Sequence, residues 1–158
     1  ESDLKIIKSG IKNILEIISA DNKFNVPQNI NGAGGGLAFG LNIFLDAEII
    51  RAEDFIKNDI LRDINLNDLD AVITGEGSFD SQSFEGKGSG IILKIFAEKN
   101  IPIFLINGST NIPPNIILPE NVFIINLTDL FHSKDESIKN YSAGIRKASQ
   151  IILNHLNK

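Results

Sequence analysis

The hydrophobic and polar positions follow a helical period at the start of the chain. From Leu4 to Ile18, apolar residues recur every three or four positions, which predicts a helix that docks through one apolar face. Residues 21–36 are rich in Asn, Gly and Pro and predict a loop. Residues 37–47 are apolar on nearly every side and predict a buried helix. A more polar stretch, residues 52–69, predicts a short helix and then a turn.

Three short apolar runs without alternation follow, at residues 71–74, 101–106 and 122–125. Such runs are typical of strands in a parallel sheet that is covered on both faces. Helices are predicted between the first two runs, over about 88–99, and after the third, over about 135–156. This order predicts an α/β fold, a Rossmann-like or flavodoxin-like parallel sheet with flanking helices.

The pattern therefore divides the chain into a helical and Gly-rich region, residues 1–69, and an α/β region, residues 70–158. With 158 residues, 42% hydrophobic and 22% charged, the chain can bury one sizeable core. It contains no methionine, so we expect a piece of a longer protein.

Charge and special residues exclude several classes of function. The net charge is -5 and Lys and Arg are scattered, which argues against nucleic-acid binding. No apolar run approaches the roughly 18 residues that cross a bilayer, so no membrane association is expected. The chain has no cysteine and only two histidines, which excludes disulfides and argues against a zinc site. A cytoplasmic location fits these features.

Two segments that follow predicted strands, residues 75–86 and 107–114, are predicted to be loops at the edge where open α/β sheets bind ligands. In the first segment, glycines let the backbone approach a ligand, and Lys87 adds a positive charge. Glu76 and Asp80 could hold Mg²⁺ or accept the proton of an attacking hydroxyl, and the sequence leaves these two roles open.

An ordinary structural explanation competes with that reading. Gly75 and Gly77 would then form a turn, Glu76 and Asp80 would cap the next helix, and Lys87 would be solvated. The segment is not a P-loop, because that motif requires glycine in place of Ser81 and Ser or Thr in place of Gly88.

Two further segments are weaker candidates. Gly34, Gly35 and Gly36 belong to a glycine run that looks like a phosphate-binding loop, but Leu37 replaces the last glycine of that pattern, and close helix packing is the alternative. Asn107 and Ser109 could offer polar donors to an anion, although polar turns after strands are common.

The segment from Ile73 to Lys87 resembles the signature of the glycerate kinase family: a strand ending in I-T-G-E-G, then R, an aliphatic residue, D, x, Q, S or T, two variable residues and G-K. The upstream glycine run and its helix, residues 32–48, also resemble that family. Two departures stand out: Ser78 replaces the arginine, and Ile30 stands where the glycine run normally begins.

This resemblance implies transfer of the ATP γ-phosphate to a hydroxyl of D-glycerate, usually O2, with Mg²⁺ bridging the phosphates. It implies that Asp80, Glu76 and Lys87 carry the catalysis, the two carboxylates also serving as Mg²⁺ ligands. Substrate or phosphate would contact further residues, namely Thr74, Gly75, Gly77, Ser78, Gln82, Gly34, Gly35, Gly36, Asn107 and Ser109.

The resemblance covers the C-terminal portion of the family, whose members are longer and form a larger two-domain enzyme. The family's D-S-x-K and G-G-S-A-T-N-D-G-G motifs do not occur here. We therefore expect the missing N-terminal part to be a partner of this segment and the segment alone to be inactive. The sequence does not decide whether the protein forms a homo-oligomer. The alternatives are another α/β enzyme that binds a nucleotide or sugar acid, and a non-catalytic ligand-binding module.

Overall fold

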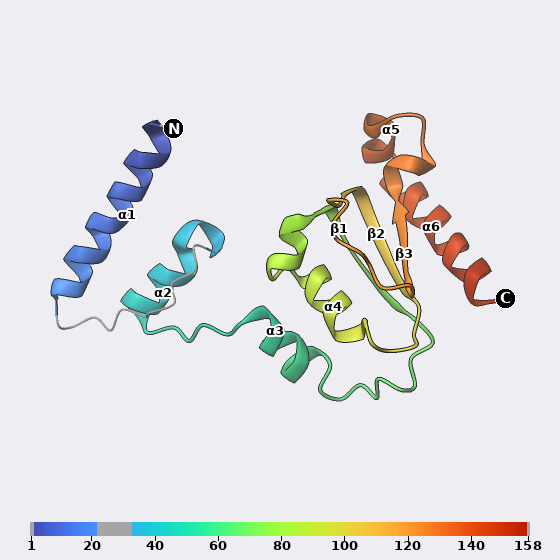
Figure 1. Ribbon diagram of the computed structural model, residues 1–158, viewed down its shortest axis with the longest axis horizontal. Coiled ribbons are helices and arrows are strands. Elements are labelled where there is room, and N and C mark those ends of the chain that lie inside the picture. Colours follow the sequence, from blue (N-terminus) through green and yellow to red (C-terminus); the bar gives the residue numbers. More distant parts are fainter. Residues whose placement is uncertain (1, 22–32, 158) are drawn as a thin grey trace. The chain divides into compact units, whose positions relative to one another are not determined.

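The computed structural model of the chain describes residues 2–21 and 33–157. The chain forms two compact units, unit 1 over Glu1–Ile50 and unit 2 over Arg51–Lys158 (Figure 1). Unit 1 is helical, and all the strands of the described residues lie in unit 2. Among the helices of the described part, none is long and apolar enough to cross a membrane.

Unit 1 contains helix α1 (Ser2–Ala20), the 3₁₀ turn η1 (Ala33–Gly36) and helix α2 (Leu37–Leu45). The periodicity of the first helix is confirmed, although of its apolar residues only Ile18 is buried. The prediction that the second helix is buried is wrong: Phe44 and Leu45 are 60% and 72% exposed. The described part of unit 1 holds too little structure to cover a helix that is apolar on all sides.

Unit 2 is an α/β unit built on a three-stranded parallel sheet in the order β1-β2-β3, which confirms the Rossmann-like prediction (Figure 1). Its elements, in chain order, are α3 (Ala52–Phe55), the π-helical turn η2 (Ile56–Ile60), β1 (Val72–Asp80), η3 (Ser81–Glu85), α4 (Gly88–Phe96), β2 (Ile103–Asn111), β3 (Val122–Asn126), η4 (Leu127–Leu130), α5 (Lys134–Lys139) and α6 (Tyr141–Leu156).

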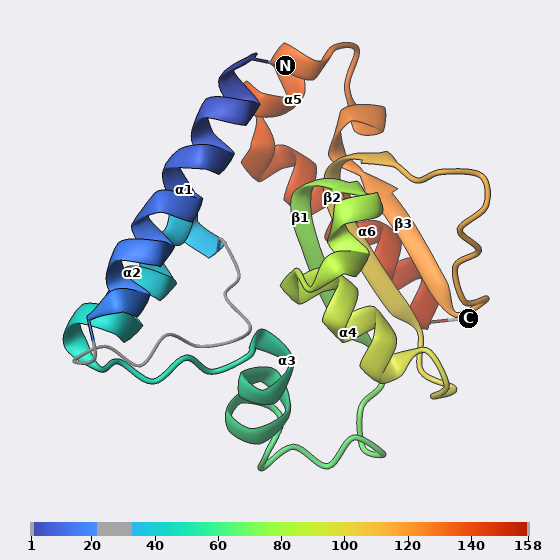
Figure 2. The same cartoon turned by 60° about the vertical axis from the view of Figure 1, so that its left-hand side comes forward.

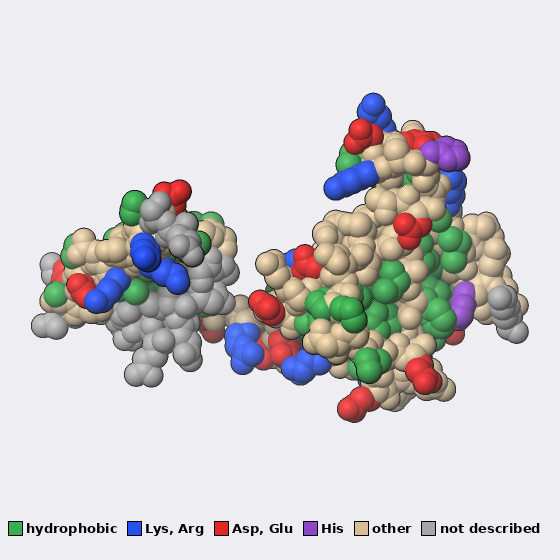
Figure 3. Space-filling model, turned by 45° about the horizontal axis from the view of Figure 1, so that its top comes forward, with side chains coloured by type: hydrophobic (Ala, Val, Ile, Leu, Met, Phe, Trp, Pro, Cys, Tyr) green, Lys and Arg blue, Asp and Glu red, His purple; other side chains and the backbone are tan. Residues whose placement is uncertain are grey.

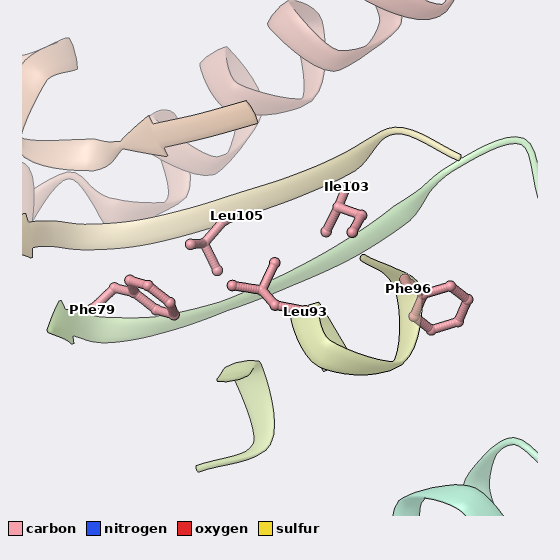
Figure 4. Packing of buried hydrophobic residues seen from close by; sticks show 5 residues of the cluster. All are labelled: Phe79, Leu93, Phe96, Ile103 and Leu105. Carbon is pink, nitrogen blue, oxygen red and sulfur yellow. The ribbon is translucent and has the colours of Figure 1, made fainter. Parts of the chain in front are cut away.

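The core of unit 2 lies on both faces of this sheet, because side chains alternate along strand β2. Ile103 and Leu105 point to the face that α4 covers and pack there with Phe79, Leu93 and Phe96 (Figure 4). Phe104, between them in sequence, points to the opposite face and packs with Ile125 and with Ala148 and Ile152 of α6. Figure 2 shows α4 and α6 on opposite sides of the sheet. Each such large side chain contributes about 1.5–3 kcal/mol when it is buried.

Four of the predicted boundaries change. The first two strands continue beyond their apolar runs to Asp80 and Asn111, because their glycine-rich and polar ends pair with each other, as at Ser78↔Ser109. The long C-terminal helix is interrupted at Asn140, which separates α5 from α6. Helix α4 ends at Phe96, a few residues before the predicted end.

Candidate functional site

The two candidate segments come together at the carboxyl ends of β1 and β2. Glu76 pairs with Asn107, and Ser78 pairs with Ser109, so these residues are strand neighbours and not residues of separate loops. The prediction that residues 75–86 and 107–114 form loops is therefore wrong for their first parts. Thr74 lies two residues before Glu76 in the same strand and pairs with Leu105.

Glycine is required in this part of the sheet because the two strands approach closely. A Cβ at Gly75 would lie 1.8 Å from the carbonyl oxygen of Ile106, and one at Gly108 would lie 2.4 Å from that of Gly77. Gly77 and Gly108 lie between two pairs of facing residues, Glu76↔Asn107 and Ser78↔Ser109. The turn that the structural alternative proposed for Gly75 and Gly77 is wrong, because both lie within β1.

Glu76 is the most heavily bonded carboxylate of the site. Ser89 of α4 donates its hydroxyl to Oε1, and the Lys87 ammonium lies 3.3 Å from Oε2. Partial burial raises the pKa of Glu76, but hydrogen bonds from Ser83, Ser89 and Lys87 and the charge of Lys87 outweigh it, so the pKa lies below its ordinary value. Glu76 is thereby held as a carboxylate that orients Lys87.

Asp80 ends β1 and caps the turn η3. Its carboxylate accepts a hydrogen bond of 2.9 Å from the backbone N–H of Gln82, and its own N–H donates to the hydroxyl of the buried Ser83. These reciprocal bonds form a capping box, so Asp80 caps η3 and not the predicted helix from Gly88, whose N-cap is Lys87. The same carboxylate lies 3.8 Å from the ammonium of Lys87.

Lys87 therefore lies between two carboxylates. Its side chain is 44% exposed, so it is both solvated and ion-paired. We call Glu76, Asp80 and Lys87 the carboxylate-lysine cluster. Its formal charge is negative, because two carboxylates face one ammonium group, and it can attract a divalent cation.

Asn107 has a structural role that the sequence did not indicate. It is 1% exposed, its Oδ1 accepts from the backbone N–H of Glu76 at 3.3 Å, and its Nδ2 donates to Thr110 at 3.0 Å. Thr110 in turn donates to Asn126 of β3 at 2.6 Å. This chain of bonds ties the carboxyl ends of all three strands together and fixes the backbone that carries Glu76.

A cavity of about 560 Å³ opens next to this edge of the sheet. Its lining includes Gly75, Glu76, Gly77 and Ser78 from β1 and Asn107 and Ser109 from β2. Of the predicted binding residues, Gly75, Gly77, Ser78, Asn107 and Ser109 therefore border one cavity, and Thr74 does not. Lys87, Asp80 and Gln82 are not among its lining residues.

Sequence reasoning missed several residues of this region. Ser83 and Ser89 bond to the cluster, and Lys134 and Tyr141 line the cavity. Ser83 had a readable signal, since a capping box places a polar side chain three residues after its N-cap. Lys134 and Tyr141 had no such signal, because they lie more than forty residues after Lys87 in the sequence. Only the fold brings them to the cavity.

Gly34, Gly35 and Gly36 lie in unit 1, whereas the other candidate residues lie in unit 2. All three adopt positive φ, from 62° to 89°, which glycine adopts without strain. Among the described residues, a Cβ at Gly35 or Gly36 would meet nothing within 4 Å, so no close helix packing requires these glycines there. Gly32 and Ile30 lie outside the described residues.

The carboxylate-lysine cluster can accommodate Mg²⁺ only together with other ligands. Among residues 2–21 and 33–157, no group of three or more His, Cys, Asp or Glu side chains is placed to hold a metal ion. Mg²⁺ is nevertheless commonly bound by one or two carboxylates and completed by substrate phosphates and water. Glu76 and Asp80 both face the Lys87 ammonium, at 3.3 and 3.8 Å, so a metal ion bound by both carboxylates would have to displace it.

Comparison with known proteins gives a consistent result. The model of the glycerate kinase family matches residues 1–157. The chain is 32% identical over 91 residues to a glycerate kinase of Bacillus subtilis, covering 58% of this chain and 24% of that protein. It is 40% identical over 78 residues to a glycerate kinase of Neisseria meningitidis, covering 49% and 21%.

A third relative is named glycerate 2-kinase and comes from Escherichia coli. It is 33% identical over 78 residues, which cover 49% of this chain and 20% of that protein. The matched part thus spans only about a fifth to a quarter of these relatives' length.

Proposed function

The chain belongs to the glycerate kinase family, and we propose that its protein transfers the γ-phosphate of ATP to a hydroxyl of D-glycerate. The observation that carries the proposal is that the family model spans residues 1–157, including the whole carboxylate-lysine cluster. The name of the Escherichia coli relative supports O2 as the acceptor hydroxyl. The cytoplasmic location stays a prediction.

We assign Glu76 to positioning and Asp80 and Lys87 to direct contact with the substrates. Both oxygens of Glu76 already accept bonds, from Ser89 and from Lys87, so this side chain acts best by holding Lys87 in place. The exposed ammonium of Lys87 can then neutralise charge on the transferred phosphate or on the carboxylate of glycerate. Asp80, fixed by the backbone of η3, can accept the proton of the attacking hydroxyl.

Mg²⁺ would be held by Asp80 together with phosphate oxygens of ATP, and when bound it would neutralise charge that develops on those oxygens; the Mg²⁺ contact expected of Glu76 would require Lys87 to leave Oε2. The chain's own residues supply a fixed geometry for this. Asp80 is anchored by two backbone N–H groups and Glu76 by Ser83 and Ser89, so neither carboxylate has to reorganise during the reaction. We keep the predicted substrate contact of Gln82 in this proposal, because the bond from its backbone N–H to Asp80 places Gln82 next to the cluster.

The test is a coupled assay of ADP release by the whole protein with Mg-ATP and D-glycerate. We expect ADP release that depends on glycerate and falls at least about 100-fold in Lys87→Ala, because a group that neutralises transition-state charge is removed. Lys139→Ala is the matched control, since Lys139 is an exposed lysine of α5 outside the cluster and the cavity.

Two results would contradict this proposal. The first is ADP release that does not depend on glycerate, which would favour another nucleotide-using enzyme of the α/β class. The second is no ADP release at all from the whole folded protein, which would favour a non-catalytic binding module. Equal activity of Lys87→Ala and Lys139→Ala would remove Lys87 from the reaction.

A further inference from the structure

The cavity of about 560 Å³ has a second wall that the proposed function does not yet use. Besides the strand ends, helices α5 and α6 line it, through the apolar side chains of Ile138, Tyr141 and Ile145. These three are 62%, 64% and 43% exposed, and they follow one another at three- and four-residue spacing. Hydrophobic side chains also remain visible on the surface of unit 2 in Figure 3. An exposed apolar wall inside a cavity indicates contact with a ligand.

The rest of the cavity is polar. Ser78, Ser109 and Thr128 line it, and among its lining residues Lys134 is the one Lys or Arg and Glu76 the one Asp or Glu. Strands β1 and β2 approach closely at Gly77 and Gly108. Because both residues are glycines, this part of the lining has no bulky side chains. The cavity thus combines an apolar wall that carries an aromatic ring with a polar region that carries the Lys134 ammonium and, from the strand, the Glu76 carboxylate.

This combination fits a nucleotide better than a small hydroxy acid. D-Glycerate has no apolar face to set against Ile138 and Tyr141, whereas a purine base stacks on an aromatic ring and a phosphate pairs with a lysine. The volume lies within the range of about 300–1,000 Å³ that is typical for cofactor and ligand pockets. The position outside the carboxyl ends of parallel strands is the usual one for such ligands.

We propose that this cavity binds the nucleoside triphosphate, with Tyr141 against the base and Lys134 on a phosphate. The inference rests on the proposed function, because it divides the two co-substrates of that reaction between two places. The nucleotide lies against α5 and α6, and the carboxylate-lysine cluster, whose Glu76 borders the cavity, receives the transferred phosphate and the acceptor. Tyr141 and Lys134 are then determinants of nucleotide affinity and not catalytic residues.

The sequence offers a direct probe, because Tyr141 is the only tyrosine and the chain has no tryptophan. Incorporation of 3-fluorotyrosine therefore gives the 158-residue chain a single fluorine signal at the proposed base site. We expect Mg-ATP and adenosine to shift this signal with saturation, inorganic triphosphate to shift it less, and D-glycerate to leave it unchanged.

Substitution of the lysine separates the two ends of the ligand. Lys134→Ala should raise the Kd for ATP by about threefold to tenfold and leave that for adenosine unchanged, because it removes a phosphate contact only. Lys139→Ala, on the same helix but outside the cavity, should change neither.

Three results would overturn the inference: no shift with ATP up to about 10 mM, well above a Kd of about 1 mM; a shift with D-glycerate equal to that with ATP; or identical ATP affinities for Lys134→Ala and Lys139→Ala. An unchanged signal would mean that no nucleotide contacts Tyr141. Nucleotide binding without glycerate-dependent turnover by the whole protein would contradict the proposed function alone, and turnover without the fluorine shift would contradict this inference alone.

Discussion

Asp80 has two roles in this account, and two substitutions separate them. As a structural residue it caps η3 through the backbone N–H groups of Gln82 and Ser83. As a proposed catalytic residue it accepts a proton through its charged carboxylate. Asp80→Asn keeps an oxygen that can cap the turn and removes the charge, whereas Asp80→Ala removes both.

The expected effects on stability follow from the contacts. Loss of an N-cap costs about 1 kcal/mol, within a range of about 0.5–2 kcal/mol. The ion pair with Lys87 is 3.8 Å long and partly exposed, so it contributes at most about 1 kcal/mol. Asp80→Ala should therefore lower the free energy of unfolding by about 1–2 kcal/mol, and Asp80→Asn by about 0.5 kcal/mol or less.

Urea unfolding of the 158-residue chain measures these differences. With a slope of about 1–2 kcal/mol per molar urea, a change of 1 kcal/mol moves the midpoint by about 0.5–1 M. ADP release by the whole protein measures the second role, and both variants should lose about 100-fold or more, as expected when a general base is removed.

The two assays together decide the role of Asp80. If Asp80→Asn destabilises the chain as much as Asp80→Ala, the capping box is not what holds this carboxylate. If Asp80→Asn keeps full turnover, the carboxylate serves the fold and takes no part in catalysis. Either result would refute the reasoning about this residue.

Other predictions follow from the same structure. Gly90→Ala should destabilise the chain by about 3 kcal/mol in urea unfolding, because its Cβ would lie 1.9 Å from the carbonyl oxygen of Ser83; Gly88→Ala, whose Cβ meets nothing within 4 Å, should be neutral or stabilising by up to about 1 kcal/mol, and equal effects would contradict the geometry. Since the pKa of Glu76 is lowered by folding, its charge stabilises the chain above the ordinary glutamate value of 4.5 and this stability is lost as the pH falls through the lower folded value. Unfolding measured against pH should therefore show a steeper acid loss for the parent chain than for Glu76→Gln, and parallel curves would contradict it. Finally, the 158-residue chain alone should release no ADP in a glycerate-dependent manner, and robust turnover by it would contradict the expected need for further family motifs.

The sequence predicted the type of each main element of unit 2 but not where the strands end. Ile103 and Leu105 could be recognised because a strand covered on both faces is continuously apolar. Gly77 and Ser109 carry no such signal, and they are extended only because the neighbouring strand pairs with that part of the backbone. Local composition could not supply this long-range pairing.

The candidate site was predictable in its residues more than in their roles. Glu76, Asp80 and Lys87 stand within twelve positions, so a single segment indicated them. That Lys87 lies between the two carboxylates depends on the turn η3, which returns the chain toward β1. Tyr141 enters the cavity only because α6 packs on the sheet, a contact that no local pattern reveals.

Phosphorus NMR of the reaction products tests the central claim most directly. The whole protein, incubated with Mg-ATP and D-glycerate, should accumulate a phosphomonoester of glycerate in step with ADP, with the phosphate on O2, and should accumulate neither when glycerate is omitted. Conversion of ATP to ADP and inorganic phosphate at the same rate with and without glycerate, or no consumption of ATP at all, would contradict the proposal that this protein phosphorylates glycerate.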